Sequence, residues 1–301
     1  MFEGFEPFMI QTQNEPHVSI GGIKSNGINN TLPPLLLIHG FPQSHLIWNR
    51  VASQLVNNYT LVLIDIRGYG SSSKPVHVSQ YAKSVMARDC VKVMDALGFQ
   101  GPFFVCAHDR GARVAHKLCV DHPDRVRKII LLDICPTLAM YSSNTLMLAR
   151  HYWHWYFLIL KEPFPEKLIS VTPRKGFEML LGGGQPEGLA IFEKDALEAY
   201  IKGFRDPAQV HAMCQDYRAG ATLDLDEARD DLAKGRLIRS PIRVLVGKDG
   251  VIAKLFDSIK EWQAVTEPGL TVEVQAVDSG HFIPENAPDT VVSTILEFFT
   301  V

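Results

Sequence analysis

The chain has 301 residues, of which 46% are hydrophobic, so it can bury the core of one large domain or of a domain with an insertion. Its formal net charge of −3 and its pI of about 6.4 give no basis for attraction to nucleic acid or to an anionic membrane. These values leave a small molecule as the expected partner.

The first residues and the cysteines indicate the cellular compartment in which we expect the protein. Acidic side chains stand near the start, where a secretory signal peptide carries basic ones, and no apolar run approaches the roughly 18 residues of a membrane span. We therefore expect a soluble, unsecreted, cytoplasmic protein with no cofactor and no metal. The cysteines are odd in number and widely spaced in apolar surroundings, which favours reduced core thiols: Cys90, Cys106, Cys119, Cys135 and Cys214.

Short apolar runs rich in Val, Ile and Leu recur along the chain and predict β-strands. Most are continuous rather than alternating, as in parallel strands that are covered on both faces. Helical patterns over 81–97 and 290–299 supply crossover connections, so the fold class is α/β with a mostly parallel sheet. The predicted strands are 35–38, 61–64, 103–106, 129–132, 242–246 and 271–277.

Between Cys135 and Ser240 the strand rhythm stops. Helix formers dominate there, with aromatic residues interleaved and with a break at Gly182, Gly183 and Gly184. We predict a helical cap over 136–239, inserted into a core formed by 1–135 and 240–301. Ligands of open parallel sheets bind beyond the carboxyl ends of the strands, so such an insertion would cover that site.

One strand breaks into the sequence His108-Asp109-Arg110-Gly111, which places a carboxylate where a strand turns into a helix. The pattern of a nucleophile flanked at two residues' distance by small residues, here Ala107 and Gly111, is typical of the nucleophile elbow of the α/β-hydrolase fold. Serine at this place would indicate acyl transfer. Aspartate instead favours displacement of a leaving group from saturated carbon, followed by hydrolysis of the resulting ester.

Two further loops are expected to meet the elbow at the strand ends. Ser279-Gly280-His281-Phe282 supplies His281 as a base that activates water, because imidazole titrates near neutral pH. His39-Gly40-Phe41-Pro42 brings the backbone N–H of Phe41, which would form an oxyanion hole with that of Arg110. The histidine needs an acidic partner, and both Asp133 and Asp249 follow predicted strands, so the residues alone leave this choice open.

Arg110 and Arg113 begin the helix after the nucleophile and share one face of it. Cations at a helix N-terminus oppose the macrodipole by roughly 0.3 to 1 kcal/mol each, so their presence beside Asp109 needs a reason. An anionic substrate supplies one, because guanidinium groups bind carboxylates bidentately and would aim the α-carbon of an acid at Asp109. Alternatively, either arginine pairs with Asp109 or with a carboxylate of the cap.

At these residues the chain resembles the fluoroacetate dehalogenases, also called haloacetate dehalogenases, over nearly its whole length. Alanine stands at positions 107 and 112, where this fold often has glycine, which is a departure from the pattern. The matching stretches are 39–42, His-Gly-Phe-Pro; 65–72, Asp-Ile-Arg-Gly-Tyr-Gly-Ser-Ser; 108–113, His-Asp-Arg-Gly-Ala-Arg; 132–134, Leu-Asp-Ile; 152–155, Tyr-Trp-His-Trp; 216–219, Asp-Tyr-Arg-Ala; and 280–282, Gly-His-Phe.

The resemblance implies an α/β-hydrolase that converts short 2-haloacids to hydroxyacids, with a haloacid and water as partners, and it allows a homodimer. It implies Asp109 as nucleophile, His281 as base, Asp133 as its acid, and Arg110 and Arg113 on the substrate carboxylate. It further implies that the departing halide is bound by His154, Trp155 and Tyr217, whose ring N–H and O–H groups can donate to it. The halogen preference stays open.

Three other functions compete with this one. An epoxide hydrolase uses the same aspartate and histidine with cap tyrosines, although a neutral epoxide would leave the arginines unpaired. A haloalkane dehalogenase normally has Trp where this chain has Arg110. A non-catalytic relative would bind a small acid without turnover. We also expect the charged run 224–234 to form a solvated helix face and 68–74 to be a structural loop.

Overall fold

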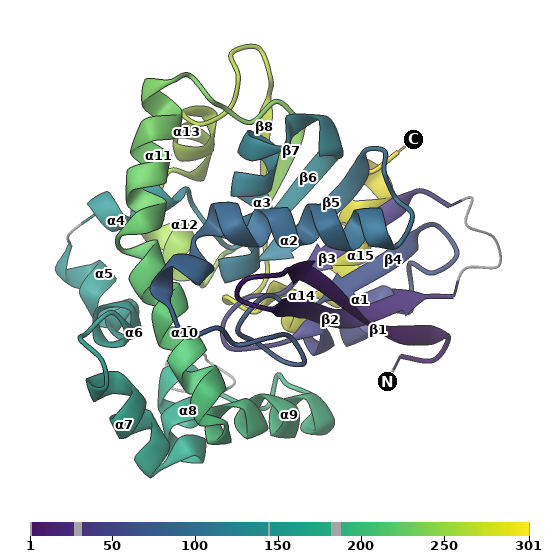
Figure 1. The fold of residues 1–301 in the computed structure, drawn as a ribbon. Coiled ribbons are helices and arrows are strands. Elements are labelled where there is room, and N and C mark those ends of the chain that lie inside the picture. Colours follow the sequence, from purple (N-terminus) through teal and green to yellow (C-terminus); the bar gives the residue numbers. More distant parts are fainter. Residues whose placement is uncertain (1, 27–31, 144, 182–187, 301) are drawn as a thin grey trace.

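The computed structural model describes residues 2–26, 32–143, 145–181 and 188–300. Over these residues an eight-stranded sheet has the order β1-β2-β4-β3-β5-β6-β7-β8 (Figure 1). β2 pairs antiparallel with β1 and β4, and all other pairs are parallel. The strands are β1 (Phe5–Gln13), β2 (Val18–Ser25), β3 (Pro34–Ile38), β4 (Thr60–Ile64), β5 (Phe103–His108), β6 (Val126–Leu132), β7 (Ile242–Gly247) and β8 (Val272–Val277).

Helices cover both faces of the sheet. α2 and α3 pack on one face, and α1 and α15 pack on the other (Figure 1). The helices outside the segment between β6 and β7 are α1 (Asn49–Ala52), α2 (Lys83–Ala96), α3 (Asp109–Asp121), α12 (Val251–Leu255), α13 (Ser258–Gln263), α14 (Ile283–Asn286) and α15 (Pro288–Phe298). Short 3₁₀ turns occupy η1 (His45–Trp48), η2 (Val78–Tyr81) and η3 (Pro123–Arg125).

Burial on both faces explains the continuous apolar runs. In β3, Leu36 and Ile38 belong to the core cluster under α2 and α3, whereas Leu35 and Leu37 belong to the cluster under α1 and α15. Successive side chains of a strand point to opposite faces, so a strand covered twice needs apolar residues at every position. The α/β fold class and the six predicted strands are confirmed, with bounds that differ by a few residues.

The segment between β6 and β7 is helical over its described residues, and we call α4 to α11 the inserted helices. Figure 1 shows most of them to one side of the sheet, with α10 and α11 running on from one another. Gly182, Gly183 and Gly184 lie outside the described residues, and the domain limits 136 and 239 stay a prediction. The inserted helices are α4 (Thr137–Ser142), α5 (Leu146–His151), α6 (Trp153–Leu158), α7 (Phe164–Val171), α8 (Pro173–Leu181), α9 (Lys194–Arg205), α10 (Pro207–Gly220) and α11 (Leu223–Ala233).

The sequence analysis did not predict the antiparallel strands β1 and β2. β1 is half-exposed and interleaves polar with apolar residues, and β2 contains Gly21 and Gly22, which usually weaken a strand. Their stability comes from pairing with each other and with β4, which is a long-range contact that no local pattern reveals.

The prediction for 224–234 is wrong in part. α11 covers this run, but Asp224 is 4% exposed and Asp231 is 7% exposed. Asp224 accepts from the backbone N–H of Lys83 (2.8 Å) and Asp231 accepts from Lys117 Nζ (2.8 Å), because α11 packs its acidic side chains against basic partners on α2 and α3. Two of these charges therefore join the inserted helices to the sheet domain rather than face solvent.

The five cysteines are buried and unbonded, as predicted. No described helix has the length and hydropathy needed to cross a membrane. The loop 68–74 is a turn between β4 and η2, and its Tyr69 is fully buried.

Glu285 in α14 is a buried carboxyl that gives the fold a pH-dependent stability. It accepts from Gln43 Nε2 (3.2 Å) and from the Tyr200 hydroxyl (3.0 Å), and burial raises its pKa to about 8 although these donors and Arg50 oppose the shift. Between about pH 4.5 and pH 8 the folded protein therefore keeps a proton on Glu285 that the unfolded chain has released. The contribution of this carboxyl to the free energy of unfolding is full below about pH 4.5 and is lost as the pH rises to about 8.

Replacing Glu285 with Gln should remove this pH dependence, because the amide is neutral in both states. We expect the free energy of unfolding of Glu285→Gln to exceed that of the wild type by about 1–3 kcal/mol above pH 8 and to match it near pH 4.5, as measured by denaturant titration. The exposed Glu3→Gln serves as control and should show no such difference. An equal offset at both pH values would contradict the burial argument.

Candidate active site

Asp109 stands at the turn between β5 and α3 in a left-handed backbone conformation, with φ of 48°. Residues other than glycine adopt this region rarely, although Asp and Asn do so more often than most. Such a conformation persists where the surrounding packing enforces it. A Cβ at Gly111 would lie 2.1 Å from the carbonyl oxygen of His39, and a Cβ at Gly40 would lie 2.5 Å from the Cβ of Asp109. Both glycines are therefore needed for the elbow to fit against the loop after β3.

The carboxylate of Asp109 meets the histidine predicted to serve it. His281 Nε2 lies 3.7 Å from Asp109 Oδ2, and His281 Nδ1 lies 2.7 Å from Asp133 Oδ2. Asp133 also has φ of 48°, and its Oδ1 accepts from the backbone N–H of Gly247 (3.0 Å). Asp249 is exposed at the rim of the same site, so of the two acids that the sequence left open, Asp133 is the one that contacts His281.

The electrostatic environment shifts the pKa of the two groups in opposite directions. Burial alone would raise the pKa of Asp109, but His281, His108, Arg110 and the Phe41 amide together lower it below its ordinary value. Burial lowers the pKa of His281, yet Asp133 and Asp109 raise it to a net value above the ordinary one. Asp109 is thus an ionised carboxylate with an imidazole beside it that readily takes up a proton.

His108 was not assigned a role in the sequence analysis, and the structure gives it one. Its Nε2 donates to the backbone carbonyl of His281 (2.8 Å), and burial lowers its pKa to about 3, so the ring is neutral. Two sequence signals could have identified His108: it directly precedes Asp109, and it begins the matching stretch 108–113. The contact ties the histidine loop to the end of β5.

One contact of the predicted oxyanion hole is formed in the structure. The backbone N–H of Phe41 donates to Asp109 Oδ1 (2.9 Å). The N–H of Arg110 lies in the first turn of α3, where helix amides have no intrahelical acceptor. Oδ1 is therefore held, while Oδ2 faces the histidine.

A cavity of about 140 Å³ lies over Asp109, between the sheet and the inserted helices. His154 and Tyr217 come from the inserted helices α6 and α10, Tyr152 lies between α5 and α6, and Phe41 and His281 come from the sheet domain. Tyr152 was not among the predicted site residues, although it lies in the matching stretch 152–155. Its pKa and that of Tyr217 are raised well above the ordinary value, chiefly by burial, so both keep their hydroxyl protons at neutral pH.

The three residues predicted to bind halide form one aromatic cluster. His154 stacks on Phe41 with ring centroids 6.0 Å apart, and its own centroid lies 6.0 Å from that of Tyr217. Trp155 lies 6.2 Å from Tyr217, behind the cavity lining. Burial lowers the pKa of His154 to about 3, so its ring is neutral and carries one N–H donor.

The two arginines lie beside the cavity rather than on its lining. Arg110 pairs bidentately with Asp216 of α10, through Nε to Oδ2 (3.1 Å) and Nη2 to Oδ1 (2.7 Å). This is the pairing with a carboxylate of the inserted segment that the sequence analysis kept as the alternative. Arg113 donates to Thr137 Oγ1 (2.8 Å) and lines a second cavity of about 40 Å³. No carboxylate within the described ranges forms an ion pair with Arg113.

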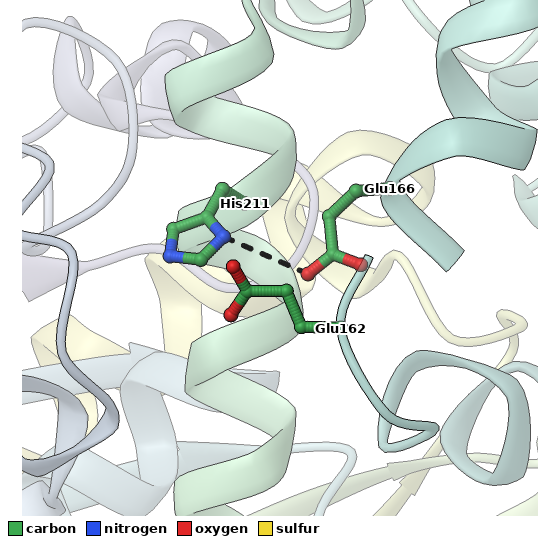
Figure 2. Close-up of side chains that lie close together, drawn as sticks. All are labelled: Glu162, Glu166 and His211. Carbon is green, nitrogen blue, oxygen red and sulfur yellow. Dashed lines mark ion pairs between the residues drawn. The ribbon is translucent and has the colours of Figure 1, made fainter. Parts of the chain in front are cut away.

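One group of side chains could approach a cation, far from Asp109. The ligand atoms of Glu162, Glu166 and His211 lie within 4.8 Å of one another, and Figure 2 shows His211 turned toward the two carboxylates. Glu166 Oε1 already accepts from Arg218 Nη1 (2.6 Å), and His211 Nε2 lies 2.9 Å from the carbonyl oxygen of Val76. Arg218 and Val76 thus already occupy two of the atoms that a cation would need, so the cluster carries no metal-site assignment.

Comparisons with known proteins agree with this geometry. Residues 33–288 match the model of the alpha/beta hydrolase fold family. The chain is 40% identical to a fluoroacetate dehalogenase from Burkholderia sp, over all of this chain and 95% of that protein. The chain belongs to the fluoroacetate dehalogenase family of α/β-hydrolases.

A second relative and a solved structure are also similar to this chain. A soluble epoxide hydrolase from Corynebacterium sp. (strain C12) is 29% identical over 88% of this chain and 90% of that protein. The crystal structure of a proposed α/β hydrolase from Nostoc sp PCC 7120 has a TM-score of 0.92 and 40% identity, over 100% of this chain and 99% of that chain. The α/β-hydrolase fold predicted from the elbow is therefore confirmed.

The proximity of Asp109 to His281 gives a titration that can be measured without substrate. We expect the pKa of His281 to fall in Asp109→Asn, because the amide lacks the negative charge that helps to raise it. NMR titration of the imidazole nitrogens, with the His281 signals identified by their loss in His281→Gln, measures this shift.

Asp249→Asn is the matched control, because it removes an exposed carboxylate at the cavity rim. It should leave the pKa of His281 nearly unchanged. A larger fall in Asp249→Asn than in Asp109→Asn would mean that the exposed acid controls the histidine.

Proposed function

We propose that the protein is a hydrolytic dehalogenase of short 2-haloacids such as fluoroacetate and chloroacetate, which it converts to glycolate. Asp109 is the nucleophile, His281 the base and Asp133 the acid that orients it. The inserted helices act as a cap over the site. The observation that carries the proposal is a set of buried hydrogen-bond donors without acceptors beside an ionised carboxylate.

These donors lie beside the cavity, behind its lining. Nη1 of Arg110, Nε of Arg113 and Nε1 of Trp155 are buried and have no partner among the residues that the structure describes. The guanidinium of Arg113 lies 5.0 Å from the Trp155 ring and 5.8 Å from that of Tyr141, whose hydroxyl also has no partner in the described part of the chain. A buried donor without an acceptor is costly, and an anion supplies acceptors.

The charge of Arg113 strengthens this argument. Burial and the neighbouring Arg110 hold its pKa below the ordinary value, although the charges of Asp109 and Asp224 oppose this shift, and no carboxylate within the described ranges forms an ion pair with it. A substrate carboxylate would compensate this charge. The substrate acid would then displace part of the aromatic side chains that pack on the two guanidinium groups. Its α-carbon would face Asp109.

The first chemical step is a displacement at that α-carbon. Asp109 Oδ1 is held by the Phe41 amide, so Oδ2 attacks, a carbon–oxygen bond forms and the carbon–halogen bond breaks with its electron pair leaving on the halide. The neutral ring of His154 and the hydroxyl of Tyr217 line the cavity and can donate to the halide. Trp155 adds a third donor from behind the lining.

The second step hydrolyses the ester on Asp109. His281 takes a proton from water, which attacks the Asp109 carboxyl carbon, while the Phe41 amide stabilises the oxyanion on Oδ1. The intermediate then collapses, the bond between the Asp109 carboxyl carbon and the glycolate oxygen breaks, and that oxygen takes the proton from His281. Asp109 keeps the oxygen of the water and releases the second water proton to solvent, which restores its carboxylate. Asp133 stabilises the protonated imidazole through its 2.7 Å contact with Nδ1.

Epoxide hydrolysis is the second candidate, and the pair Tyr152 and Tyr217 favours it. Both phenols line the same cavity as Asp109, and both keep the proton that an opening epoxide would need. The epoxide hydrolase relative supports this candidate. Against it, a neutral epoxide leaves the buried guanidinium of Arg113 uncompensated.

The deciding test is halide release from fluoroacetate and chloroacetate by the purified protein. We expect both halides to be released, and we expect Asp109→Asn to lose at least about a thousandfold in rate because no ester can form. In His281→Gln the ester should persist, seen by mass spectrometry as one carboxymethyl group added to Asp109.

Asp278→Asn, an exposed aspartate near the histidine loop, should keep the wild-type rate. Chloride release without fluoride release would narrow the proposal to weaker carbon–halogen bonds. Hydrolysis of an epoxide such as styrene oxide, with no halide released from either acid, would replace the proposal with the second candidate.

Trp155→Phe tests the halide donors. The phenyl ring keeps the aromatic packing against Tyr141 and Tyr152 but removes the buried N–H. We expect kcat to fall by about tenfold or more with fluoroacetate and less with chloroacetate, because fluoride depends more on hydrogen bonds to leave. Trp153→Phe, on the exposed side of α6, is the control and should affect neither rate. An equal fall with both acids would contradict the assignment.

A further inference from the structure

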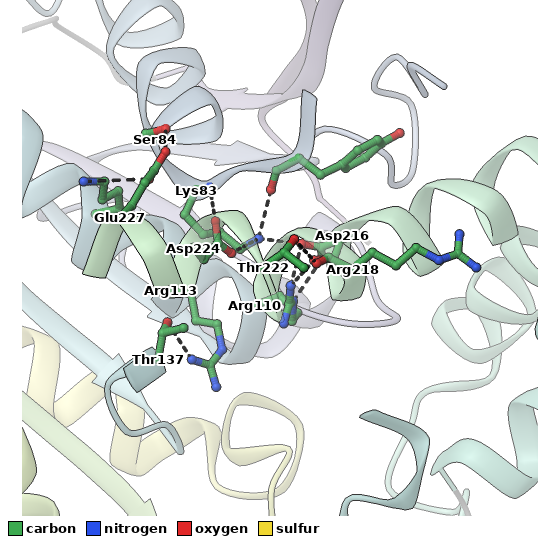
Figure 3. Close-up of polar contacts among 12 residues, drawn as sticks. Lys83, Ser84, Arg110, Arg113, Thr137, Asp216, Arg218, Thr222, Asp224 and Glu227 are labelled. Carbon is green, nitrogen blue, oxygen red and sulfur yellow. Dashed lines mark hydrogen bonds and ion pairs between the residues drawn. The ribbon is translucent and has the colours of Figure 1, made fainter. Parts of the chain in front are cut away.

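A buried chain of alternating charges connects the nucleophile helix to the inserted helices. Asp216 on α10 is fully buried and accepts from Arg110, from Lys83 Nζ (2.6 Å) and from the Tyr69 hydroxyl (2.8 Å). Lys83 in turn lies 3.3 Å from Asp224 Oδ2 on α11. Figure 3 shows Lys83 between the two carboxylates, with Arg110 on the far side of Asp216.

The geometry at Arg110 leaves a single nitrogen free. Nε donates to Asp216 Oδ2 (3.1 Å), while Nη2 donates to Oδ1 (2.7 Å) and to the backbone oxygen of the same residue (2.5 Å). The plane of the guanidinium is thereby fixed, and it lies over the Tyr217 ring at 4.4 Å from the centroid. Nη1 is buried and has no partner in the part of the chain described.

We propose that Asp216 is a positioning residue for substrate binding, which fixes the Arg110 guanidinium so that only Nη1 is available to the substrate carboxylate. This inference rests on the proposed function. Asp216 does not line the cavity over Asp109 and acts only through Arg110. Lys83 and Tyr69 fix the carboxylate itself, so the orientation of Arg110 is set by three elements of the fold.

The charges around Asp216 keep it ionised in this role. Burial would raise the pKa of Asp216, but Arg110 and Lys83 outweigh burial and lower it below the ordinary value. A carboxylate with two cationic partners also neutralises part of the positive charge of Arg110. The substrate carboxylate would therefore meet one cation that already has an ion pair, Arg110, and one that has none within the described ranges, Arg113.

Asp216→Asn tests the proposal, with Asp224→Asn as the matched control. Both variants remove a buried carboxylate that pairs with Lys83, but only Asp216 touches Arg110. We expect Asp216→Asn to raise KM for chloroacetate about tenfold or more with a smaller change in kcat, because the lost contact orients a group that binds substrate and transition state alike. Asp224→Asn should change KM less than about twofold, although it lowers thermal stability comparably.

Binding of acetate, measured by calorimetry, reports on Arg110 without turnover. It should weaken about tenfold in Asp216→Asn and stay unchanged in Asp224→Asn. Should Asp216→Asn fail to fold, Tyr69→Phe takes its place, since it removes one donor to Oδ2 and should raise KM about two- to fivefold.

The outcomes separate this inference from the proposed function. An unchanged KM in the folded Asp216→Asn, or in Tyr69→Phe if that variant stands in, overturns the positioning role while halide release still stands. An equal rise of KM in Asp224→Asn also overturns it, because the effect would then belong to the whole charge network. If the wild type releases no halide, the proposed function fails, and acetate binding alone then tests the role of Asp216. Weaker binding in Asp216→Asn than in the wild type supports that role. Equal binding in both proteins, or no binding to the wild type, refutes it.

Discussion

The left-handed turn at Asp109 is the constraint on which the site depends. It raises one carboxylate above the end of β5 and brings it to the Phe41 amide on one side and to His281 on the other. The same turn starts α3, so the next residue, Arg110, points to the inserted helices, where it forms an ion pair with Asp216. A shift of this turn would move the Asp109 carboxylate away from the Phe41 amide and from His281 together, because both contacts arise from it.

Buried charge is distributed unevenly around that turn, and the imbalance favours an acid as substrate. Arg110, Lys83, Asp216 and Asp224 form a network of two cations and two carboxylates. Arg113 stands outside it, held by a threonine hydroxyl, a methionine sulfur and aromatic rings. A buried cation without an ion pair is costly, and an anionic ligand in the cavity of about 140 Å³ over Asp109 would supply the missing charge, which is the basis of the proposed preference for a short acid.

The shared architecture explains why epoxide hydrolases are relatives of this chain. An aspartate nucleophile, a histidine and a second acid serve both an alkyl halide and an epoxide, since each reaction forms and hydrolyses an ester. The difference lies in the groups around the leaving atom and the rest of the substrate. Here two phenols line the cavity and could protonate an oxygen, and two arginines lie beside it and could bind a carboxylate, so the proposed preference for an acid rests on Arg110 and Arg113.

The sequence by itself determined the class of fold and the loops that carry the site. Continuous apolar runs identified the parallel strands because burial on both faces requires apolar residues at every position, and the small residues at the elbow identified Asp109 because the turn has no room for larger ones. The sequence did not reveal β1 and β2, the choice between Asp133 and Asp249 from the residues alone, or the partners of Arg110 and of the acids in α11. Only the tertiary structure decided these points, since each depends on contacts between residues far apart in the chain, whose geometry and burial no local pattern encodes.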